Sequence, residues 1–351
     1  MRNEKFIAPY IEFINENFET KEHLFMVYGN DTFNVPLANN VVDNTMISTK
    51  KINVFAKIKK IIALYYFYFQ LFIRMKEAKK IIIHGLFDRR LVRLLALFPM
   101  YLSKSYWVIW GKDLYKDILN PPKTLKQKWR FYIESKVKKN IAYYVTYLKG
   151  DYDLAKKQYS SKSKYCECIM YISNIYSEYD LPEKKTGKIT ILVGNSSELS
   201  NNHNDIFDKL IKLPEQNFNI ICPLSYGPKQ HADKIILLGK LTFGERFTPL
   251  TDFMPFNEYL KILADVDIAI FAHKRQQAMG NIITLLGLGK TVYMRNDITP
   301  FSFFKTLGID VFNVNALELE LLDEVTISNN KKNIKQYFSK VNLVKQSQNI
   351  F

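Results

Sequence analysis

The residues Trp110-Gly111-Lys112-Asp113-Leu114-Tyr115 directly follow an apolar run and combine aromatic rings with a carboxylate. Trp and Tyr faces stack on sugar rings, and an Asp side chain can bind a sugar hydroxyl or accept its proton. A strand that only fills a core does not need such an ending. We therefore expect a sugar-binding site at this corner, formed by Trp110, Gly111, Asp113 and Tyr115.

A second polar corner follows the apolar residues 81–83, where His84, Gly85 and Asp88 occur. Parallel strands end at the same edge of a sheet, and ligands of such sheets bind at that edge. We therefore assign these three residues to the same site. The alternative for His84 is a hydrogen-bonded structural histidine.

The second half of the chain has a comparable corner at Gly194-Asn195-Ser196-Ser197, between an apolar run and a predicted helix. Glycine lets the backbone approach a ligand closely, and the N–H groups of a helix start bind anions. This pattern predicts a nucleotide or phosphate site, although serine is also an ordinary helix cap. Tyr226 ends the next apolar run, and either borders a base or sugar or is a simple turn residue.

A basic, glutamine-rich loop is the strongest candidate for a phosphate site. Arg275, Gln276 and Gln277 follow an apolar run, and Gly280 and Asn281 stand where a helix is expected to begin. A guanidinium can donate two hydrogen bonds to one phosphate, and a helix N-terminus favours negative charge. We expect these residues to bind a nucleoside diphosphate.

Signatures of several other enzyme classes are missing. The chain has no G-x-x-x-x-G-K-[ST], H-E-x-x-H or G-x-S-x-G, and no G-x-G-x-x-G after its first strand. This argues against P-loop NTPases, zinc peptidases, serine hydrolases and dinucleotide oxidoreductases. The three cysteines, Cys166, Cys168 and Cys222, are too few for a zinc site, and we expect reduced thiols in a cytosolic protein. We expect neither a metal nor another cofactor.

Short apolar runs alternate with helical patterns along the whole chain, which predicts α/β domains with parallel sheets covered on both faces. The predicted strands are residues 23–29, 79–85, 106–111, 141–148, 188–195, 218–227, 234–240, 267–273 and 290–296. Helical patterns include residues 6–18, 256–266 and 281–289, and a helix is expected to open after Asn195.

The polar segment 177–188 contains Pro and Gly, a composition that predicts a linker between domains. We therefore expect two Rossmann-like, doubly wound domains with a cleft between them. The expected bounds are 1–180 for an N-terminal, acceptor-binding and membrane-facing domain and 188–335 for a nucleotide-sugar-binding domain. Residues 336–351 are expected to form a tail or helix that returns to the N-terminal domain.

Charge is unevenly distributed. The first 185 residues contain 32 Lys and Arg against 18 Asp and Glu, whereas the remainder contains 18 against 16. A cationic half indicates a polyanionic partner such as an anionic membrane surface, a phosphorylated substrate or nucleic acid. Nucleic-acid binding remains an alternative, although no RNP or helix-turn-helix signature is present.

Two segments of this cationic half have the composition of helices that lie on a membrane. Residues 61–73 are 13 uncharged residues between lysine-rich flanks, which is too short for a span of about 20 residues. Residues 89–104 place three arginines before an apolar run. The alternative is a buried helix with solvated ends. The N-terminus has no apolar segment of a secretory signal.

Several of these motifs together resemble one enzyme family. The matching residues are Trp110-Gly111-x-Asp113-Leu114-Tyr115, His84-Gly85, residues 191–196, and Arg275-Gln276-Gln277 with Gly280. They are similar to the TDP-N-acetylfucosamine:lipid II N-acetylfucosaminyltransferases, glycosyltransferase family 56, over roughly residues 80 to 305. The chain departs from that family at its start, where a helical pattern replaces the family's first strand and turn.

The resemblance implies a GT-B fold, with acceptor contacts in the first domain and donor contacts in the second. It implies transfer of a 4-acetamido-4,6-dideoxyhexose such as Fuc4NAc from a TDP-sugar to an undecaprenyl-diphosphate-linked saccharide of the enterobacterial common antigen. It also implies a peripheral location on the cytoplasmic face of the bacterial inner membrane. Because the N-terminus differs, a UDP-sugar enzyme of O-antigen or capsule synthesis is an alternative.

In this hypothesis Arg275 and the backbone at Gly280 and Asn281 stabilise the leaving diphosphate. If the enzyme inverts the anomeric centre, it needs a general base, for which Asp113 and His84 are the candidates. If the enzyme retains it, Asp113 orients the acceptor. The sequence does not distinguish the two.

Overall fold

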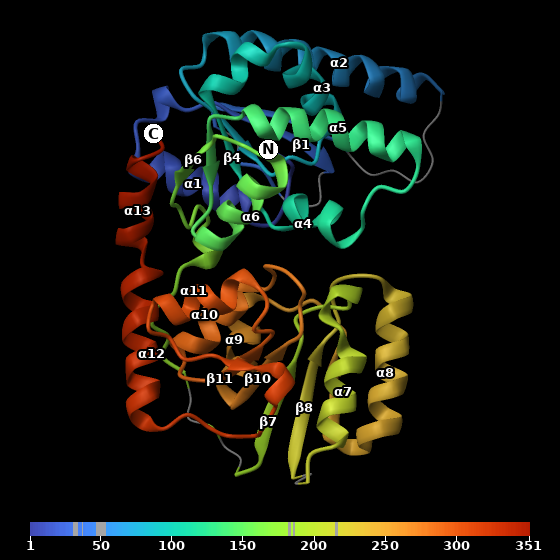
Figure 1. Ribbon diagram of the computed structural model, residues 1–351, viewed down its shortest axis with the longest axis vertical. Helices are drawn as coiled ribbons and strands as arrows, with labels where there is room; N and C mark the ends of the chain where they lie inside the picture. Colours follow the sequence, from blue (N-terminus) through green and yellow to red (C-terminus); the bar gives the residue numbers. More distant parts are fainter. Residues whose placement is uncertain (31–33, 37, 47–53, 182–183, 185–186, 215–216) are drawn as a thin grey trace. The chain divides into compact units, whose positions relative to one another are not determined.

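The computed structural model describes all residues except 31–33, 37, 47–53, 182–183, 185–186 and 215–216 (Figure 1). The chain divides into two compact units, Met1–Ser173 with Lys340–Phe351, and Asn174–Ser339. The predicted linker, residues 177–188, falls at the start of unit 2, and four of its residues lie outside the described part. Within the described residues, no helix has both the length and the apolar composition that crossing a bilayer requires.

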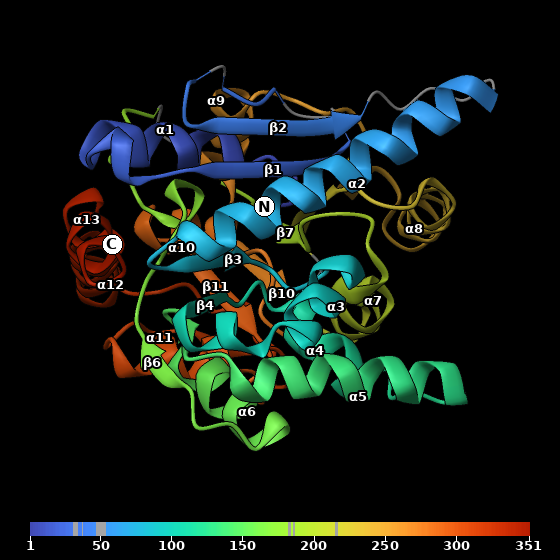
Figure 2. The ribbon, with the colours of Figure 1, turned by 90° about the horizontal axis from the view of Figure 1, so that it is seen from above.

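Unit 1 contains a sheet of four parallel strands whose spatial order follows the chain. These strands are β3 (Ile81–His84), β4 (Ser105–Val108), β5 (Tyr143–Val145) and β6 (Lys164–Cys166). A separate parallel pair consists of β1 (Phe25–Asn30) and β2 (Val41–Met46), which lie side by side in Figure 2. Before the first helix, a single bridge joins Arg2 to Tyr28 of β1.

Seven α-helices are described in unit 1. They are α1 (Ile7–Asn17), α2 (Val54–Glu77), α3 (Arg89–Leu97), α4 (Lys112–Leu119), α5 (Leu125–Asn140), α6 (Lys149–Tyr159) and α13 (Lys340–Gln348). The chain end after α13 is held by Lys80, whose Nζ donates to the carbonyl of Ile350 at 2.6 Å. The ring of Phe351 packs against the rings of Phe18 and His23.

The core of unit 1 is rich in aromatic side chains, and a lysine is buried among them. Trp107 of β4 and Tyr144 of β5 are fully buried and meet edge to face at 5.1 Å. Lys138 of α5 is also fully buried; its Nζ lies 2.7 Å from Glu134 and 4.7 Å from the centre of the Trp107 ring. A buried charge needs such compensation, so this lysine fixes α5 against the sheet.

Unit 2 is a six-stranded parallel sheet in the order β12-β11-β10-β7-β8-β9. Its strands are β7 (Ile189–Val193), β8 (Phe218–Pro223), β9 (Phe247–Leu250), β10 (Ile268–Phe271), β11 (Thr291–Met294) and β12 (Phe312–Asn313). Its helices are α7 (His203–Ile211), α8 (Lys229–Phe243), α9 (Phe256–Asp265), α10 (Met279–Gly287), α11 (Thr299–Thr306) and α12 (Glu324–Tyr337). The strand order reverses between β7 and β10, and such a switch point is where doubly wound sheets bind ligands.

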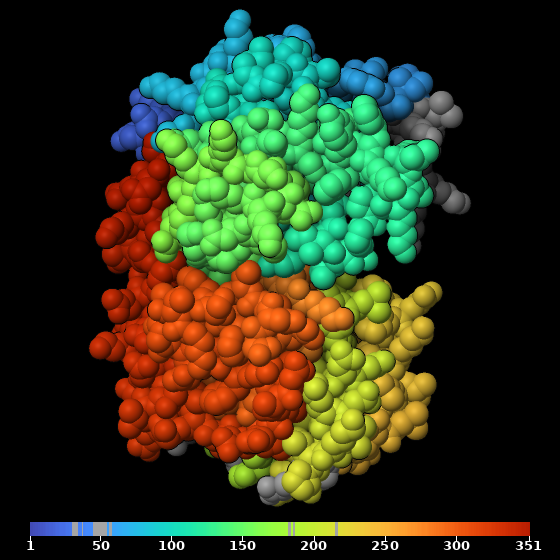
Figure 3. All heavy atoms as spheres, in the orientation of Figure 1, coloured from blue at the N-terminus to red at the C-terminus, as the bar shows by residue number. Residues whose placement is uncertain are grey.

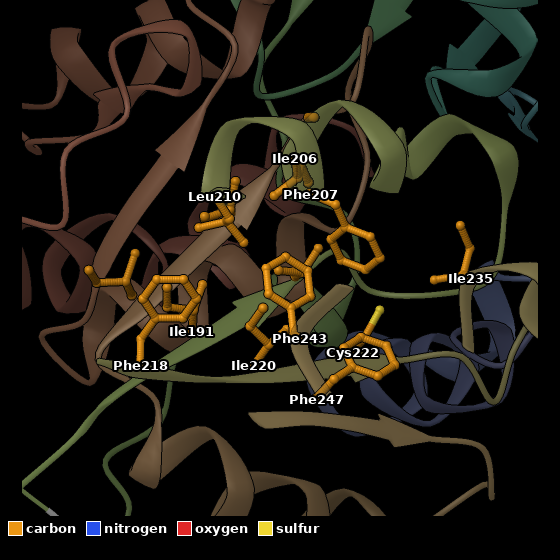
Figure 4. Close-up of a cluster of buried hydrophobic side chains, with 14 of the residues drawn as sticks. Ile191, Ile206, Phe207, Leu210, Phe218, Ile220, Cys222, Ile235, Phe243 and Phe247 are labelled. Carbon is orange, nitrogen blue, oxygen red and sulfur yellow. The ribbon is translucent and has the colours of Figure 1, made fainter. Parts of the chain in front are cut away.

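Phenylalanines from two helices and two strands fill the core on one side of this sheet (Figure 4). The ring of Phe207 on α7 lies 5.3 Å from that of Phe243 on α8 and 5.7 Å from that of Phe247 on β9. The two helices are thus held on the half of the sheet formed by β7, β8 and β9.

The predicted parallel α/β architecture is confirmed, with one wrong strand. Residues 234–240, expected as a strand, lie inside α8. Four apolar residues in a row suggested a strand, but Ile235 and Gly239 are buried while Leu237 is 62% exposed, which is helical spacing. The expected strands at 23–29, 79–85, 106–111, 141–148, 188–195, 218–227, 267–273 and 290–296 correspond to β1, β3, β4, β5, β7, β8, β10 and β11.

Gly239 provides a test of this helix packing. Gly→Ala inside a helix normally stabilises by about 0.5–1 kcal/mol. Here an added Cβ would lie 2.4 Å from the Phe247 ring, so we expect Gly239→Ala to lower the free energy of unfolding by about 1–3 kcal/mol. Urea unfolding measures this change. The control is Lys240→Ala at the exposed neighbouring position, whose free energy of unfolding should stay near that of wild type. A more stable Gly239→Ala variant would contradict the packing of α8 on β9.

Candidate active site

The loops after β7 and β10 meet at the switch point of unit 2. The two strands pair in parallel, with Val193 opposite Ile270, and the N–H of Gly194 donates to the carbonyl of Ile270 at 2.9 Å. Residues that follow the two strands therefore start from adjacent points of one sheet edge. These are the two loops for which the sequence predicted donor contacts.

Asn201 connects the two loops. Its side chain is fully buried, and its Oδ1 accepts from the N–H of Asn195 at 2.9 Å and from Nε2 of His273 at 2.9 Å. Its Nδ2 donates to Oγ of Ser196 at 3.0 Å. One amide thus fixes the backbone after β7 to a side chain at the end of β10.

Gln277 adds a second, more exposed connection. Its Nε2 lies 3.4 Å from Oδ1 of Asn195, and its Oε1 accepts from Oγ of Ser200 at 2.8 Å. Of the predicted donor residues, the structure therefore brings together Asn195, Ser196 and Gln277. Asn201, Ser200 and His273 were not predicted, although the polar run from Ser196 to Asn204 is a signal for them.

The helix predicted directly after Asn195 is wrong. The helix α7 begins only at His203, so Gly194 to Ser197 are loop residues and not a helix N-terminus. Ser196 and Ser197 are buried, and Ser197 donates to the carbonyl of Tyr226 through its N–H at 2.7 Å and its Oγ at 3.0 Å. The Ser196 hydroxyl forms hydrogen bonds within the loop after β7, whereas Ser197 joins that loop to the loop after β8.

Glycine is required at two points of this site. Gly194 has φ +69°, and an added Cβ would lie 2.7 Å from Oδ1 of Asn201. Gly227 has φ +119°, and a Cβ there would lie 2.6 Å from Oγ of Ser197. Next to it, Tyr226 is 64% exposed, a position from which its ring can meet a ligand.

The loop after β10 ends in the helix start that the sequence predicted. Ala278 has φ +59° and precedes α10, which places Gly280 and Asn281 in the first helical turn. Arg275 is half-buried, and its Nη1 donates to the carbonyl of Gln276 at 2.8 Å. Among the described residues, Oε1 of Gln276 is buried and has no hydrogen-bond partner. This loop offers a cation, an amide and a helix N-terminus for a diphosphate.

His203 is a buried polar side chain that the sequence analysis missed. It is 1% exposed, and neither ring nitrogen has a hydrogen-bond partner among the described residues. Burial, followed by the nearby charge of His231, lowers the pKa of His203 to about 4. It lies beneath the loop after β7, where a Cβ on Gly194 would come within 3.0 Å of Nε2.

In unit 1, Asp113 organises the corner after β4. Its side chain is fully buried and accepts three hydrogen bonds: Oδ2 from the N–H of Leu86 at 2.9 Å and from Nε1 of Trp107 at 2.7 Å, and Oδ1 from the N–H of Trp110 at 3.0 Å. This burial does not fit direct contact with an acceptor sugar or proton transfer. The structure assigns Asp113 a positioning role for the loops after β3 and β4.

His84 and Trp110 meet through Tyr171, which the sequence analysis did not identify. Nε1 of Trp110 donates to the Tyr171 hydroxyl at 2.6 Å, and that hydroxyl lies 2.7 Å from Nδ1 of His84. Burial lowers the pKa of His84 well below 6.5, so the ring is neutral. Because an indole N–H can only donate, the hydroxyl is left to donate to Nδ1. With its lone pair engaged and the ring buried, His84 does not fit the role of general base.

The other predicted acceptor residues have structural contacts. Gly85 and Gly111 have φ +69° and +76° and form the two turns. The hydroxyl of Tyr115 donates to Oδ1 of Asp151 at 2.7 Å in the core. Asp88 caps α3 by accepting from the N–H of Arg90 at 2.6 Å. Of the predicted acceptor set, Trp110 and Asp88 are the partly exposed members.

Two Asp-x-Asp triplets, of a type that can hold a metal–nucleotide pair, occur in the chain. In the first, Asp151 is bonded to Tyr115 in the core. In the second, Asp267 pairs with Lys184 and accepts from the N–H of Thr190. Among the described residues, no three His, Cys, Asp or Glu side chains form a group that could hold a metal ion. The absence of a metal cofactor stays a prediction.

Comparison with solved structures gives the class of the fold. Sucrose-phosphate synthase from Thermosynechococcus elongatus matches with a TM-score of 0.65 and 10% identity, covering 93% of this chain and 87% of that chain. A UDP-forming α,α-trehalose-phosphate synthase from Burkholderia vietnamiensis matches at 0.63 and 7%, covering 99% and 98%. WaaG, a glycosyltransferase of lipopolysaccharide biosynthesis, matches at 0.55 and 11%, covering 99% and 92%. The protein has the GT-B fold of glycosyltransferases.

The family follows from the sequence itself. Residues 14–340 match the family described as 4-alpha-L-fucosyltransferase, glycosyl transferase group 56. The chain belongs to this family, and the protein is a glycosyltransferase. The resemblance inferred from its motifs is confirmed.

Removing the Asp113 carboxylate should destabilise unit 1. Asp113→Ala leaves three donors without an acceptor in the interior, and we expect a loss of about 3 kcal/mol in the free energy of unfolding. Chemical denaturation followed by tryptophan fluorescence measures it. The control is Asp153→Ala, which removes only an exposed ion pair with Lys149 and should cost less than about 0.5 kcal/mol. Equal effects of the two substitutions would contradict the positioning role.

The buried histidines of unit 2 predict a loss of stability in mild acid. Burial, followed by the charge of His231, lowers the pKa of His203 to about 4. Burial, followed by the charges of Arg275 and His203, lowers the pKa of His273 to about 3. Both lie below the unfolded value of about 6.5, so the unfolded state binds more protons and the free energy of unfolding falls as the pH drops below that value. We expect a loss of about 1 kcal/mol per histidine between about pH 7 and 5.5. Urea unfolding over this range should show a smaller loss in the free energy of unfolding for His203→Gln than for wild type. A His203→Gln variant with the pH dependence of wild type would contradict the assignment of a lowered pKa to His203.

Proposed function

We propose that the protein transfers a 4-acetamido-4,6-dideoxyhexose such as Fuc4NAc from a TDP-sugar to an undecaprenyl-diphosphate-linked saccharide. The product belongs to a bacterial surface polysaccharide, the enterobacterial common antigen or an O-antigen. Membership of glycosyl transferase group 56 supports the reaction class. The main observation for the location of the site is that the loops after β7 and β10 are hydrogen-bonded to each other at the switch point of unit 2.

The donor diphosphate binds at the loop after β10 in this proposal. Transfer breaks the bond between the anomeric carbon and the diphosphate oxygen, so negative charge develops on the leaving group. Arg275 and the first turn of α10, with Gly280 and Asn281, supply positive potential and N–H donors for that charge. Asn195, Gln277 and the exposed ring of Tyr226 are placed to contact the nucleoside or sugar.

The acceptor binds at the corner after β4. Trp110 is the partly exposed aromatic of this corner; its backbone N–H is held by Asp113 and its indole N–H by Tyr171. The indole therefore has a fixed orientation for stacking on a sugar ring. Asp113 and His84 act by positioning in this proposal, and the anomeric configuration of the product, read by NMR, distinguishes retention from inversion.

A lipid-linked acceptor would place the reaction at the cytoplasmic face of the inner membrane, and we propose that the enzyme is peripheral there. An alternative within the same fold is a UDP-sugar enzyme of O-antigen or capsule synthesis. The trehalose-phosphate synthase with a similar fold is named as UDP-forming. A transfer assay with both TDP- and UDP-sugars on lipid-linked acceptors separates the two, and repeating it with EDTA tests the prediction that no metal is needed.

Arg275 gives the sharpest test of donor binding. We expect Arg275→Ala to lower kcat about 100-fold or more, because the leaving diphosphate loses a charged donor. The matched control is the exposed neighbour Lys274→Ala, which should stay within about threefold of wild type. An Arg275→Ala enzyme with wild-type turnover would remove Arg275 from the proposed mechanism, and no transfer from any nucleotide-sugar by the wild type would overturn the proposed function.

A further inference from the structure

Helix α2 of unit 1 exposes an apolar stripe along its length. Six large side chains recur at three- or four-residue spacing on its outer face: Phe55, Ile58, Ile62, Tyr65, Phe69 and Ile73. Tyr65 is 72% exposed, Phe55 67% and Ile62 62%. Between Lys60 and Arg74 the helix carries no charged residue. A helix on a protein surface normally places polar residues on its outer face, so this stripe needs a cause.

The opposite face of α2 is packed, so the stripe is a fixed surface. Phe67 and Met75 are 3% and 2% exposed, and the Phe72 ring lies 4.7 Å from that of Phe98. The Tyr68 hydroxyl donates to Asp88, the cap of α3. Figure 2 shows α2 crossing unit 1, and in Figure 3 its side chains form part of the outer surface of that unit.

Cations flank the stripe along the chain. Residues 59–104 contain ten Lys and Arg and two acidic residues. Of the acidic residues, Glu77 pairs with Arg74 at 3.0 Å, and Asp88 caps α3. Helix α3 exposes Arg89, Arg90 and Arg93, and its last residue, Leu97, is 74% exposed. The surface thus combines insertable apolar and aromatic side chains with positive charge.

We infer that the outer face of α2, with α3 beside it, is the surface through which the protein enters one leaflet of an anionic bilayer. Tyrosines favour the level of the lipid headgroups, and Lys and Arg beside them bind anionic lipid. The 13 uncharged residues are too few for a span and suit a helix lying in the interface. This inference deepens the proposed function by naming the surface that meets the membrane.

A second copy of this chain fits the surface less well than lipid. In a symmetric pair formed through α2, the cations beside one stripe would face the same cations of the other copy. Repulsion would oppose that pairing, whereas an anionic bilayer satisfies the apolar stripe and its basic flanks together.

The test is co-sedimentation of the full-length protein with phosphatidylglycerol-containing vesicles that hold no lipid-linked saccharide, without nucleotide. We expect wild-type binding that weakens in high salt. The double variant Ile62→Ser/Phe69→Ser should bind about tenfold more weakly. The matched control Leu241→Ser/Val325→Ser removes side chains of α8 and α12 that are at least as exposed, and it should bind like wild type.

Wild type that fails to bind these vesicles, or an α2 variant that binds as wild type does, would overturn the inference. An α2 variant that converts a dimer into a monomer with unchanged vesicle binding would also overturn it and would point to a second copy. The turnover of the donor with a water-soluble acceptor analogue measures the proposed transfer activity separately from membrane binding. The α2 variant should keep the wild-type turnover in this assay. Loss of transfer with intact vesicle binding would count against the function alone.

Discussion

The parallel pairing of β7 with β10 is the constraint on which the candidate donor site depends. These strands are neighbours in space although their last residues, Val193 and Phe271, lie 78 positions apart in the chain. The pairing brings two loops of opposite crossover direction to one sheet edge, and Asn201 then bonds them to each other. Arg275 and the start of α10 belong to one of these loops, so their position follows from the sheet order.

In unit 1 the loops after the strands are also held by buried hydrogen bonds, but through different side chains. There a buried carboxylate, Asp113, receives two backbone N–H groups and an indole, and a buried tyrosine links His84 to Trp110. In both units buried side chains such as Asp113 and Asn201 hold loops in place, while the aromatic residues Trp110 and Tyr226 keep part of their surface exposed. Buried polar networks fix a single arrangement because a lost bond is costly in the interior.

Much of the sheet architecture could be predicted because continuous apolar runs identify strands buried on both faces. β2 was missed since its sequence VVDNTM is half polar, and the run KIILLGK was misread because four consecutive apolar residues hide the helical burial of Ile235 and Gly239. The predicted corners do follow strands β3, β4, β7 and β10. The burial of Asp113 and His84 could not be predicted, because it depends on contacts such as Trp110 with Tyr171, which are distant in sequence.

The central claim is that the donor nucleotide binds at the β7–β10 edge of unit 2. Hydrogen–deuterium exchange of the full-length protein with and without TDP and UDP tests this location directly. The account predicts slower exchange in residues 194–202 and 274–281 with the nucleotide that serves as donor. Protection confined to the β9 or β12 edges of the sheet, or to unit 1, would contradict it.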